Sequence, residues 1–249
     1  NYIVRVIDNL SGGRLNNLKK HKTNKNSIFA NKNILEVKKD DKLFKDVEYV
    51  FHFAGSGDIV PSIENPMHYM DTNVVGTTKI LEASKKTNIK KFIYAASSSC
   101  YGLAKTPTDE KHPISTEYPY ALTKYMGELV TMHWSKVYKL PAISIRIFNA
   151  YGPRVRTTEL HGAVFGAVLK QKLANKPLTV VGNGKQKRDF LYVTDVVQAF
   201  FLAAKSKKKS EIYNLGASTP QSINKLAKII GGKISYLPKR PGEPDCTWA

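Results

Sequence analysis

The stretch that decides the fold is Lys91-Phe-Ile-Tyr-Ala-Ala-Ser-Ser-Ser-Cys-Tyr-Gly102. Five apolar residues follow Lys91 without interruption, which is typical of a strand covered on both faces of a parallel sheet. Similar strand-like runs occupy residues 2–7, 49–53 and 142–148. Apolar residues at helical spacing fill two of the intervals, 67–87 and 120–138. This alternation predicts an α/β domain with a doubly wound parallel sheet over about residues 1–150.

The chain becomes less regular after Gly152-Pro153, where Gly and Pro punctuate shorter elements. We expect helices at about 161–174, 194–205 and 222–230, and strands at 178–181 and 212–214. Residues 151–249 are therefore predicted to form a smaller region. Part of it should return to the main sheet, so the two regions interleave.

Composition excludes several classes of protein. The 249 residues are 42% hydrophobic, include 2 Cys, and contain no apolar run near the roughly 20 residues that span a bilayer. A disordered chain, an integral membrane protein and a disulfide scaffold are thereby excluded. The first ten residues do not show the basic n-region followed by an apolar core that is typical of a signal peptide. We therefore expect a cytoplasmic protein.

The net charge of +19 is large, but its distribution along the chain is diffuse. Only seven of the 39 basic residues are arginines, and the lysines occur mainly as scattered pairs. Nucleic-acid-binding proteins usually interleave Arg with aromatic residues on one surface, and no such tract is present. The sequence therefore favours a solvated lysine-rich surface, with no nucleic acid or membrane partner. It remains compatible with an anionic small-molecule substrate.

A serine cluster and a Tyr-x-x-x-Lys pair are the candidate catalytic features. Ser97 lies at the carboxyl end of the central strand, where ligands bind in open α/β sheets. Tyr120 and Lys124 are four residues apart and share a helix face. We expect the Lys124 ammonium to lower the pKa of Tyr120 and make proton transfer feasible. A serine-rich turn and an exposed cation–tyrosine contact are the alternatives for each feature taken alone.

Polar residues at other loop positions are candidates for binding anions and ribose. Asp8 follows the first strand, where an acidic residue can hold the ribose hydroxyls of NAD. Arg188 and Arg240 stand in loops bounded by Gly or Pro and suit bidentate phosphate binding, and Asn149 is a further candidate anion contact. Turn chemistry at Asp8 and buried ion pairs at the arginines are the structural alternatives.

Together these features resemble the extended short-chain dehydrogenase/reductase family, and its sugar-nucleotide 4-epimerases most of all. The matching segments run in order through the whole chain: Val6-Ile-Asp-Asn-Leu-Ser-Gly12, His52-Phe-Ala-Gly55, Asp71-Thr-Asn-Val-Val-Gly-Thr77, Ser97-Ser-Ser-Cys-Tyr-Gly102, Tyr120-x-x-x-Lys124, Arg146-Ile-Phe-Asn-Ala-Tyr-Gly-Pro-Arg154, Gln186-Lys-Arg-Asp-Phe-Leu-Tyr-Val-Thr-Asp195 and Arg240-Pro-Gly-Glu243. The resemblance implies a Rossmann-like NAD-binding domain at 1–150 and a nucleotide-sugar-binding region at 151–249.

The resemblance also implies a role for each matching residue. The catalytic residues would be Ser97, Tyr120 and Lys124. NAD would be bound by Asp8, Asn9, Ser11, Gly12, Phe53, Ala54, Gly55, Asn73, Tyr120 and Lys124. The UDP-sugar would be bound by Ser97, Asn149, Val164, Arg188, Arg240, Glu243 and Thr247. No metal is implied, and a homodimer is expected.

The sequence departs from the family pattern in three ways. The family opens with a strand and Gly-x-x-Gly-x-x-Gly, whereas this chain opens at what would be the second strand and stops before the closing helices. We therefore expect a fragment whose main sheet lacks a middle strand. Ser98 and Ser99 replace the Asp-Glu pair of the 4,6-dehydratases, which disfavours dehydration. Thr247 is smaller than the aromatic residue of some epimerases and leaves space for an N-acetyl group.

The leading hypothesis is NAD-dependent epimerisation at C4 of a UDP-sugar, either UDP-glucose/galactose or an N-acetyl form, through a 4-keto intermediate. Another nucleotide-sugar enzyme of the same family, such as a reductase, decarboxylase or dehydratase, is the first alternative. A non-catalytic Rossmann protein that binds RNA is the second, because of the +19 charge. The Ser97, Tyr120 and Lys124 set favours the enzyme.

Overall fold

The computed structural model describes residues 2–155, 164–239 and 244–249. Its main sheet holds four parallel strands in the order β10 (Glu211–Leu215), β5 (Ala142–Ile147), β4 (Lys91–Ser97) and β3 (Tyr49–His52). The α/β class and the parallel sheet predicted from the sequence are confirmed. β10 comes from the second half of the chain, and it pairs with β5 along its whole length.

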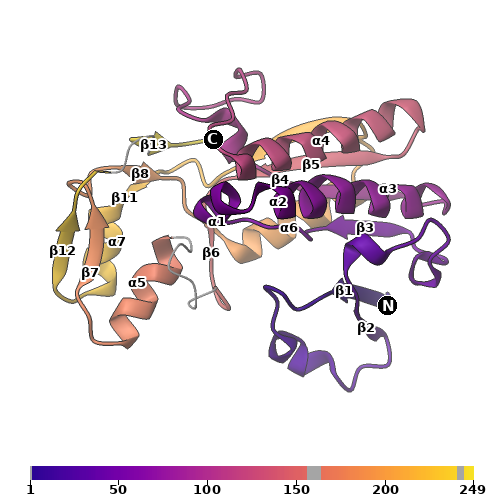
Figure 1. Ribbon diagram of the computed structural model, residues 1–249, viewed down its shortest axis with the longest axis horizontal. Helices are drawn as coiled ribbons and strands as arrows, with labels where there is room; N and C mark the ends of the chain where they lie inside the picture. The colour runs from indigo at the N-terminus through magenta and orange to yellow at the C-terminus, as the bar shows by residue number, and fades with distance from the viewer. Residues whose placement is uncertain (1, 156–163, 240–243) are drawn as a thin grey trace.

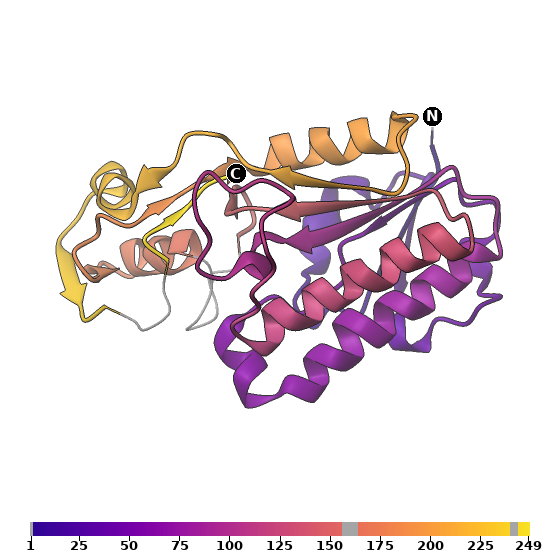
Figure 2. The ribbon, with the colours of Figure 1, turned by 90° about the horizontal axis from the view of Figure 1, so that it is seen from above.

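Helices cover both faces of this sheet (Figure 2). α3 (Thr77–Lys85) and α4 (Pro119–Val137) lie on one face together with the short helices α1 (Ile59–Glu64) and α2 (Pro66–Met70), and α6 (Val193–Lys205) lies on the other. Strand β4 is apolar from residue 92 to residue 96 because its side chains pack into the layers on both faces of the sheet. Phe92 packs toward α3 and α4, and Ile93 packs toward Phe200 of α6.

β1 (Val4–Asp8) and β2 (Ser27–Asn31) form a separate parallel pair. No ladder joins β1 to β3 in the described residues. Ile7 of β1 packs against the core of the main domain, and the ring of the preceding Tyr2 lies 6.2 Å from that of Tyr49, centroid to centroid. Short 3-10 turns at 15–21, 34–36 and 42–44 complete this part of the chain (Figure 1).

The helix expected over 67–87 is divided into three pieces in the structure. A π-helical turn, Asp71–Gly76, separates α2 from α3. The hydroxyl of Thr77 donates to the carbonyl of Asn73 at 2.7 Å, which holds the widened turn. A Cβ on Gly76 would lie 2.9 Å from Cγ1 of Ile34, so glycine is required for this close packing. The apolar spacing alone did not reveal the π turn.

The C-terminal region lies at one end of the molecule (Figure 1). α5 (Val164–Leu173) and α7 (Ile223–Ile230) pack on the parallel pair β7 (Leu178–Val181) and β12 (Ile234–Leu237). Short strands link the region to the main domain: β6 (Ala150–Tyr151), β8 (Lys187–Arg188), β9 (Leu191–Tyr192), β11 (Gln221–Ser222) and β13 (Cys246–Thr247). Among the described residues, no helix is long and apolar enough to cross a bilayer.

Candidate active site

The predicted catalytic residues meet at the carboxyl ends of the main strands. Strand β4 ends at Ser97, and residues 98–101 turn away from it in a 3-10 turn. Ser97 Oγ accepts the backbone N–H of Ser99 at 3.2 Å and lies 2.8 Å from the Ser99 hydroxyl. The serine cluster is therefore a turn cap as well as a candidate site. This edge of the sheet faces the C-terminal region (Figure 1).

Tyr120 stands in the first turn of α4, directly opposite the serine cluster. Its hydroxyl donates to Ser97 Oγ at 3.1 Å, although the two residues are 23 positions apart. Burial raises the pKa of Tyr120, while the hydrogen bonds with Ser97 and Ser99 oppose this rise. The expectation that Lys124 lowers this pKa is wrong for this structure, because burial outweighs the attractive contacts.

Lys124 lies one helical turn beyond Tyr120 and is 8% exposed. Its Nζ donates to the carbonyl of Ala95 and lies 4.6 Å from the centre of the Tyr94 ring. Burial lowers the pKa of Lys124 to about 8, while the charge of Glu128 acts in the opposite direction. The ammonium is thus held against strand β4 rather than hydrogen-bonded to the Tyr120 hydroxyl.

Asn73 clamps the loop after β3 to helix α4. Its side-chain oxygen accepts the N–H of Ser56 at 2.8 Å, and its amide donates to the carbonyl of Ser56 and to Thr123 Oγ1, each at 3.0 Å. A Cβ on Gly55 would lie 2.9 Å from this Asn73 oxygen and 3.6 Å from Lys124 Nζ. Gly55, Asn73 and Lys124 therefore converge, as their predicted shared site requires.

The predicted ribose-binding residues form local turns at the end of β1. Asp8 Oδ1 accepts the N–H of Leu10 at 2.6 Å, and Asn9 Oδ1 accepts the N–H and hydroxyl of Ser11 at 3.1 and 2.7 Å. A Cβ on Gly13 would lie 2.8 Å from the Asp8 carboxylate, so the chain passes close over this group. The Asp8 carboxylate thus lies against the backbone of the turn that follows β1.

Phe53 and Ala54 occupy different environments, although both follow β3. The Phe53 ring stacks on Phe200 of α6, with ring centres 4.5 Å apart. Ala54 packs against the core between the sheet and α3. Both are adjacent in the chain to the loop that Asn73 holds.

Asn149 and Thr247, both predicted to bind the nucleotide sugar, touch each other. Asn149 Nδ2 donates to Thr247 Oγ1 at 2.7 Å, and Thr247 is opposite Arg188 in the β13–β8 ladder. Arg188 is 8% exposed and donates to the carbonyl of Pro244 at 2.9 Å. Val164 begins α5. Arg240 and Glu243 lie outside the described residues.

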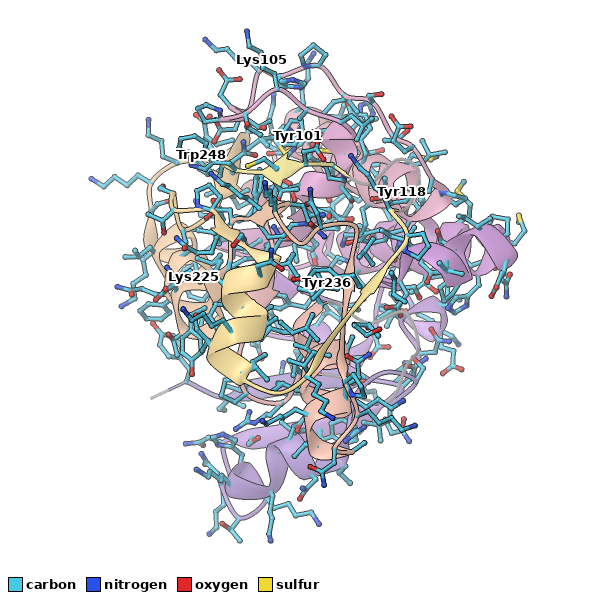
Figure 3. The ribbon with its side chains drawn as sticks, turned by 90° about the vertical axis from the view of Figure 1, so that its left-hand side faces the viewer. Tyr101, Lys105, Tyr118, Lys225, Tyr236 and Trp248 are labelled. Carbon is cyan, nitrogen blue, oxygen red and sulfur yellow. The ribbon has the colours of Figure 1, made fainter. Side chains whose placement is uncertain are left out.

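Tyr118 lies between Tyr120 of α4 and this second group, and no sequence pattern predicted this position. Its ring is parallel to that of Tyr120, with centres 6.4 Å apart. Burial raises the pKa of Tyr118 to about 12, and the positive charge of Arg188 opposes the rise. Figure 3 shows the side of the molecule on which Tyr118 lies, and there the loop with Lys105 lies above Tyr101 and Trp248.

A buried ionic network beneath the site was also missed by sequence reasoning. The guanidinium of Arg146 on β5 donates to both carboxylate oxygens of Glu128 on α4, with distances from 2.6 to 3.2 Å, and also to the Tyr101 hydroxyl. The Ser144 hydroxyl donates to Glu128 at 2.8 Å. A Glu four residues after Lys124 on the same helix face was the available signal.

Asp189 is a second buried carboxylate that ties distant segments together. It is fully buried and accepts the N–H groups of Ala217, Ser218 and Ala249 at 3.0 to 3.3 Å. Its own N–H donates to the carbonyl of Thr247 at 2.9 Å. Asp189 therefore fixes the strand of Arg188 against the loop after β10 and the end of the chain.

The amino-acid sequence matches a known protein family. The sequence model of the NAD dependent epimerase/dehydratase family matches residues 1–216. A putative UDP-glucose 4-epimerase of Methanocaldococcus jannaschii is 36% identical over 239 residues, which cover 95% of this chain and 76% of that protein. Human dTDP-D-glucose 4,6-dehydratase is 30% identical over 92% of this chain and 65% of its own length.

Solved structures of nucleotide-sugar 4-epimerases have the same fold as this chain. A UDP-N-acetylglucosamine 4-epimerase from Methanobrevibacter ruminantium, in complex with UDP-N-acetylmuramic acid, superposes with a TM-score of 0.94 at 30% identity, over 99% of this chain and 81% of that chain. A UDP-glucuronic acid 4-epimerase from Bacillus cereus, with UDP-glucuronic acid and NAD, gives 0.91 at 30% identity over 100% and 82%. The chain belongs to the NAD-dependent epimerase/dehydratase family, an enzyme family of Rossmann fold, and NAD is its cofactor.

Proposed function

We propose that this protein interconverts the C4 epimers of a UDP-sugar. The observation that carries the proposal is the hydrogen bond of 3.1 Å between Tyr120 and Ser97 at the carboxyl edge of the sheet. It places two hydroxyl groups where a sugar hydroxyl can meet both, next to the buried ammonium of Lys124. The superposition on a solved UDP-N-acetylglucosamine 4-epimerase, with a TM-score of 0.94 over 99% of this chain, supports the proposal.

The residues around Gly55 fit a bound NAD. Gly55 has no side chain where the loop approaches Asn73 and Lys124, and Gly13 likewise leaves the Asp8 carboxylate close to backbone. We assign the adenosine ribose to Asp8, Asn9, Ser11 and Gly12, and the nicotinamide half to the loop Phe53-Ala54-Gly55 with Lys124. NAD, when bound, supplies the redox chemistry at C4.

Tyr120 acts as the base in this proposal. As the phenolate, its oxygen takes the proton of the sugar 4-hydroxyl and returns it after the 4-keto sugar has rotated in the site. Ser97 donates a hydrogen bond to the same sugar oxygen and so orients it. The hydrogen bonds with Ser97 and Ser99 favour the phenolate form that the burial of Tyr120 opposes, and the buried Lys124 is assigned to the nicotinamide ribose.

The C-terminal region holds the nucleotide in this proposal. We assign residues 151–249 to nucleotide-sugar binding and 1–150 to NAD. Asn149, Val164, Arg188, Arg240, Glu243 and Thr247 are the proposed contacts.

Epimerisation is favoured over dehydration by the residues beside Ser97. Dehydratases of the family use an Asp-Glu pair after the catalytic residue as acid and base. Here Ser98 and Ser99 occupy these positions, and the Ser99 hydroxyl is engaged with Ser97 at 2.8 Å. No carboxylate stands there to eliminate water, so the sugar keeps its oxygen at C6.

Proton NMR of nucleotide-sugar mixtures tests the proposal. The protein is incubated with NAD and, separately, UDP-glucose, UDP-N-acetylglucosamine and UDP-glucuronate. We expect the C4 epimer of at least one of them, and Tyr120→Phe should lower its rate by about 10²-fold or more. Tyr125→Phe on the same helix is the matched control and should keep the activity. A new C6 methyl signal would identify a dehydratase, and the absence of any product would refute the assignment.

We further propose a homodimer formed by α1, α2 and α4, with the protein in a reducing compartment such as the cytoplasm. Ile63 and Met67 are 60% and 65% exposed, and Leu129 on the neighbouring α4 is 50% exposed. Cys100 and Cys246 are unpaired, which agrees with that compartment. Light scattering after gel filtration should give the dimer mass, and Leu129→Asp should give the monomer. A monomeric wild type would exclude this interface.

A further inference from the structure

The tertiary structure gathers lysines that are scattered in the sequence. Four loops meet at the amino ends of the main strands, opposite the catalytic edge: residues 45–48, 85–91, 136–141 and 205–210. They contain eleven lysines, two carboxylates and no arginine. We call these four loops the basic edge. The basic edge lies where α3, α4 and α6 end, at the right-hand side of Figures 1 and 2.

Backbone hydrogen bonds hold the four loops side by side. The N–H of Lys90 donates to the carbonyl of Glu48 at 2.6 Å, and that of Phe92 donates to Pro141 at 3.0 Å. The N–H of Ser210 donates to the carbonyl of Ala142 at 2.7 Å. The lysines therefore share one surface as a direct result of the parallel sheet.

The positive charge of the basic edge is largely uncompensated. Ion pairs join Lys85 to Glu82 and Lys90 to Glu48, and the described residues provide no other pair on this surface. The buried Lys91 donates to the carbonyl of Lys208, and burial together with the charge of Lys209 lowers the pKa of Lys91. Like charges are thus crowded at this edge.

The helix dipole explains the position of only some of these lysines. A basic residue in the last turn of a helix is stabilising, as Lys85 and Lys205 are here. The run Lys207–Lys209 lies beyond the end of α6, in a loop, and Lys139 likewise follows α4. Since the dipole effect falls off within the last turn, these lysines need another reason.

The neighbouring apolar side chains distinguish a lipid surface from a nucleic acid. Val137, Tyr138 and Phe201 are 45 to 50% exposed beside the lysines. Lys85 Nζ lies 4.0 Å from the centre of the Tyr138 ring and Lys205 Nζ lies 4.4 Å from that of Phe201, so one face of each ring already holds a cation and is not available to a base. Lysine charges beside exposed apolar groups suit the interface of an anionic bilayer.

We propose that the basic edge docks on an anionic lipid bilayer. The exposed lysines, which exclude the buried Lys91, would lie against the headgroups, with Val137 and Tyr138 entering the interface. The catalytic edge would then face away from the membrane, because it lies at the other end of the parallel strands. This inference is independent of the reaction proposed above, since its test measures binding alone.

Vesicle co-sedimentation of the full chain tests the proposal. The probes are phosphatidylcholine vesicles with and without about 30% phosphatidylglycerol, at about 0.1 M and about 0.5 M salt. We expect binding to the anionic vesicles alone, and only at the lower salt. The triple variant Lys207→Glu, Lys208→Glu and Lys209→Glu should lose about tenfold or more in affinity.

A second triple variant provides the control for bulk charge. Lys170→Glu, Lys172→Glu and Lys176→Glu change the net charge equally at the far end of the molecule, around α5 (Figure 1). We expect less than a twofold change in affinity for this variant. Equal losses in both variants would show a bulk charge effect and overturn the proposal. So would the absence of vesicle binding, or tighter binding of a single-stranded oligonucleotide that depends on residues 207–209.

Discussion

The stability of the folded protein should rise between pH 7 and pH 9.5 because of Lys124, and the substitution Lys124→Met should abolish this rise. Burial lowers the pKa of the Lys124 ammonium from 10.5 to about 8. One pKa unit corresponds to about 1.4 kcal/mol, so keeping this ammonium charged inside the protein costs about 3 kcal/mol at pH 7. Lys124 is therefore a candidate catalytic residue that reduces stability at neutral pH.

The direction of the effect follows from proton binding. Between pH 8 and pH 10.5 the unfolded chain keeps the Lys124 proton while the folded state releases it. Because the unfolded state binds more protons in this window, the free energy of unfolding increases with pH. Integrated from pH 7 to pH 9.5, the gain from this one group is about 2 kcal/mol.

Urea unfolding at pH 7, 8, 9 and 9.5 measures the effect. The difference in free energy of unfolding between wild type and Lys124→Met should change by about 2 kcal/mol in favour of wild type over this range. Lys136→Met, at an exposed lysine of the same helix, is the matched control and should follow the wild-type curve. Parallel curves for wild type and Lys124→Met would show that Lys124 keeps an ordinary pKa and would refute the reasoning.

Three further outcomes are expected. Glu128→Gln should lower the free energy of unfolding by about 3 kcal/mol, because it leaves a buried guanidinium without its charge partner; a urea-measured loss below about 1 kcal/mol would contradict this. Asp189→Ala should weaken UDP binding by about tenfold or more in calorimetry and leave NAD binding unchanged, since it frees the strand of the proposed nucleotide contacts; equal losses for both ligands would disprove a local role. Gly127→Ala should destabilise by about 2 kcal/mol, because its Cβ would meet the Tyr94 hydroxyl, whereas Gly57→Ala has no atom within 4 Å and should be neutral in thermal melts; similar melts for the two variants would show that the helix contact is adjustable.

Much of the fold could be predicted because its signals are local. The strand at 91–97 and the helix at 119–137 have apolar patterns that span their whole length. Alternation of such elements restricts the chain to a parallel sheet with helices on both faces. Ser97 and Tyr120 could be paired in advance because strand ends and helix starts meet at one edge of such a sheet.

The pKa values of the site residues could not be predicted from the sequence pattern. A Tyr-x-x-x-Lys spacing indicates that two groups share a helix face, but it carries no information on their burial. In the structure burial dominates, raising the pKa of Tyr120 and lowering that of Lys124. The clamp by Asn73 escaped prediction for a related reason, because its partners Ser56 and Thr123 lie 17 and 50 positions away in the chain.

The amino-acid sequence by itself determined the family, the order of the elements and the candidate residues at the carboxyl edge of the main sheet, since periodicity and short motifs are properties of neighbouring residues. The ion pair between Glu128 and Arg146, 18 positions apart, and the meeting of Asn149 with Thr247, 98 positions apart, were decided by the tertiary structure alone. The basic edge is the clearest case. Lysines that look dispersed along the chain are brought together because every strand of a parallel sheet begins at the same edge.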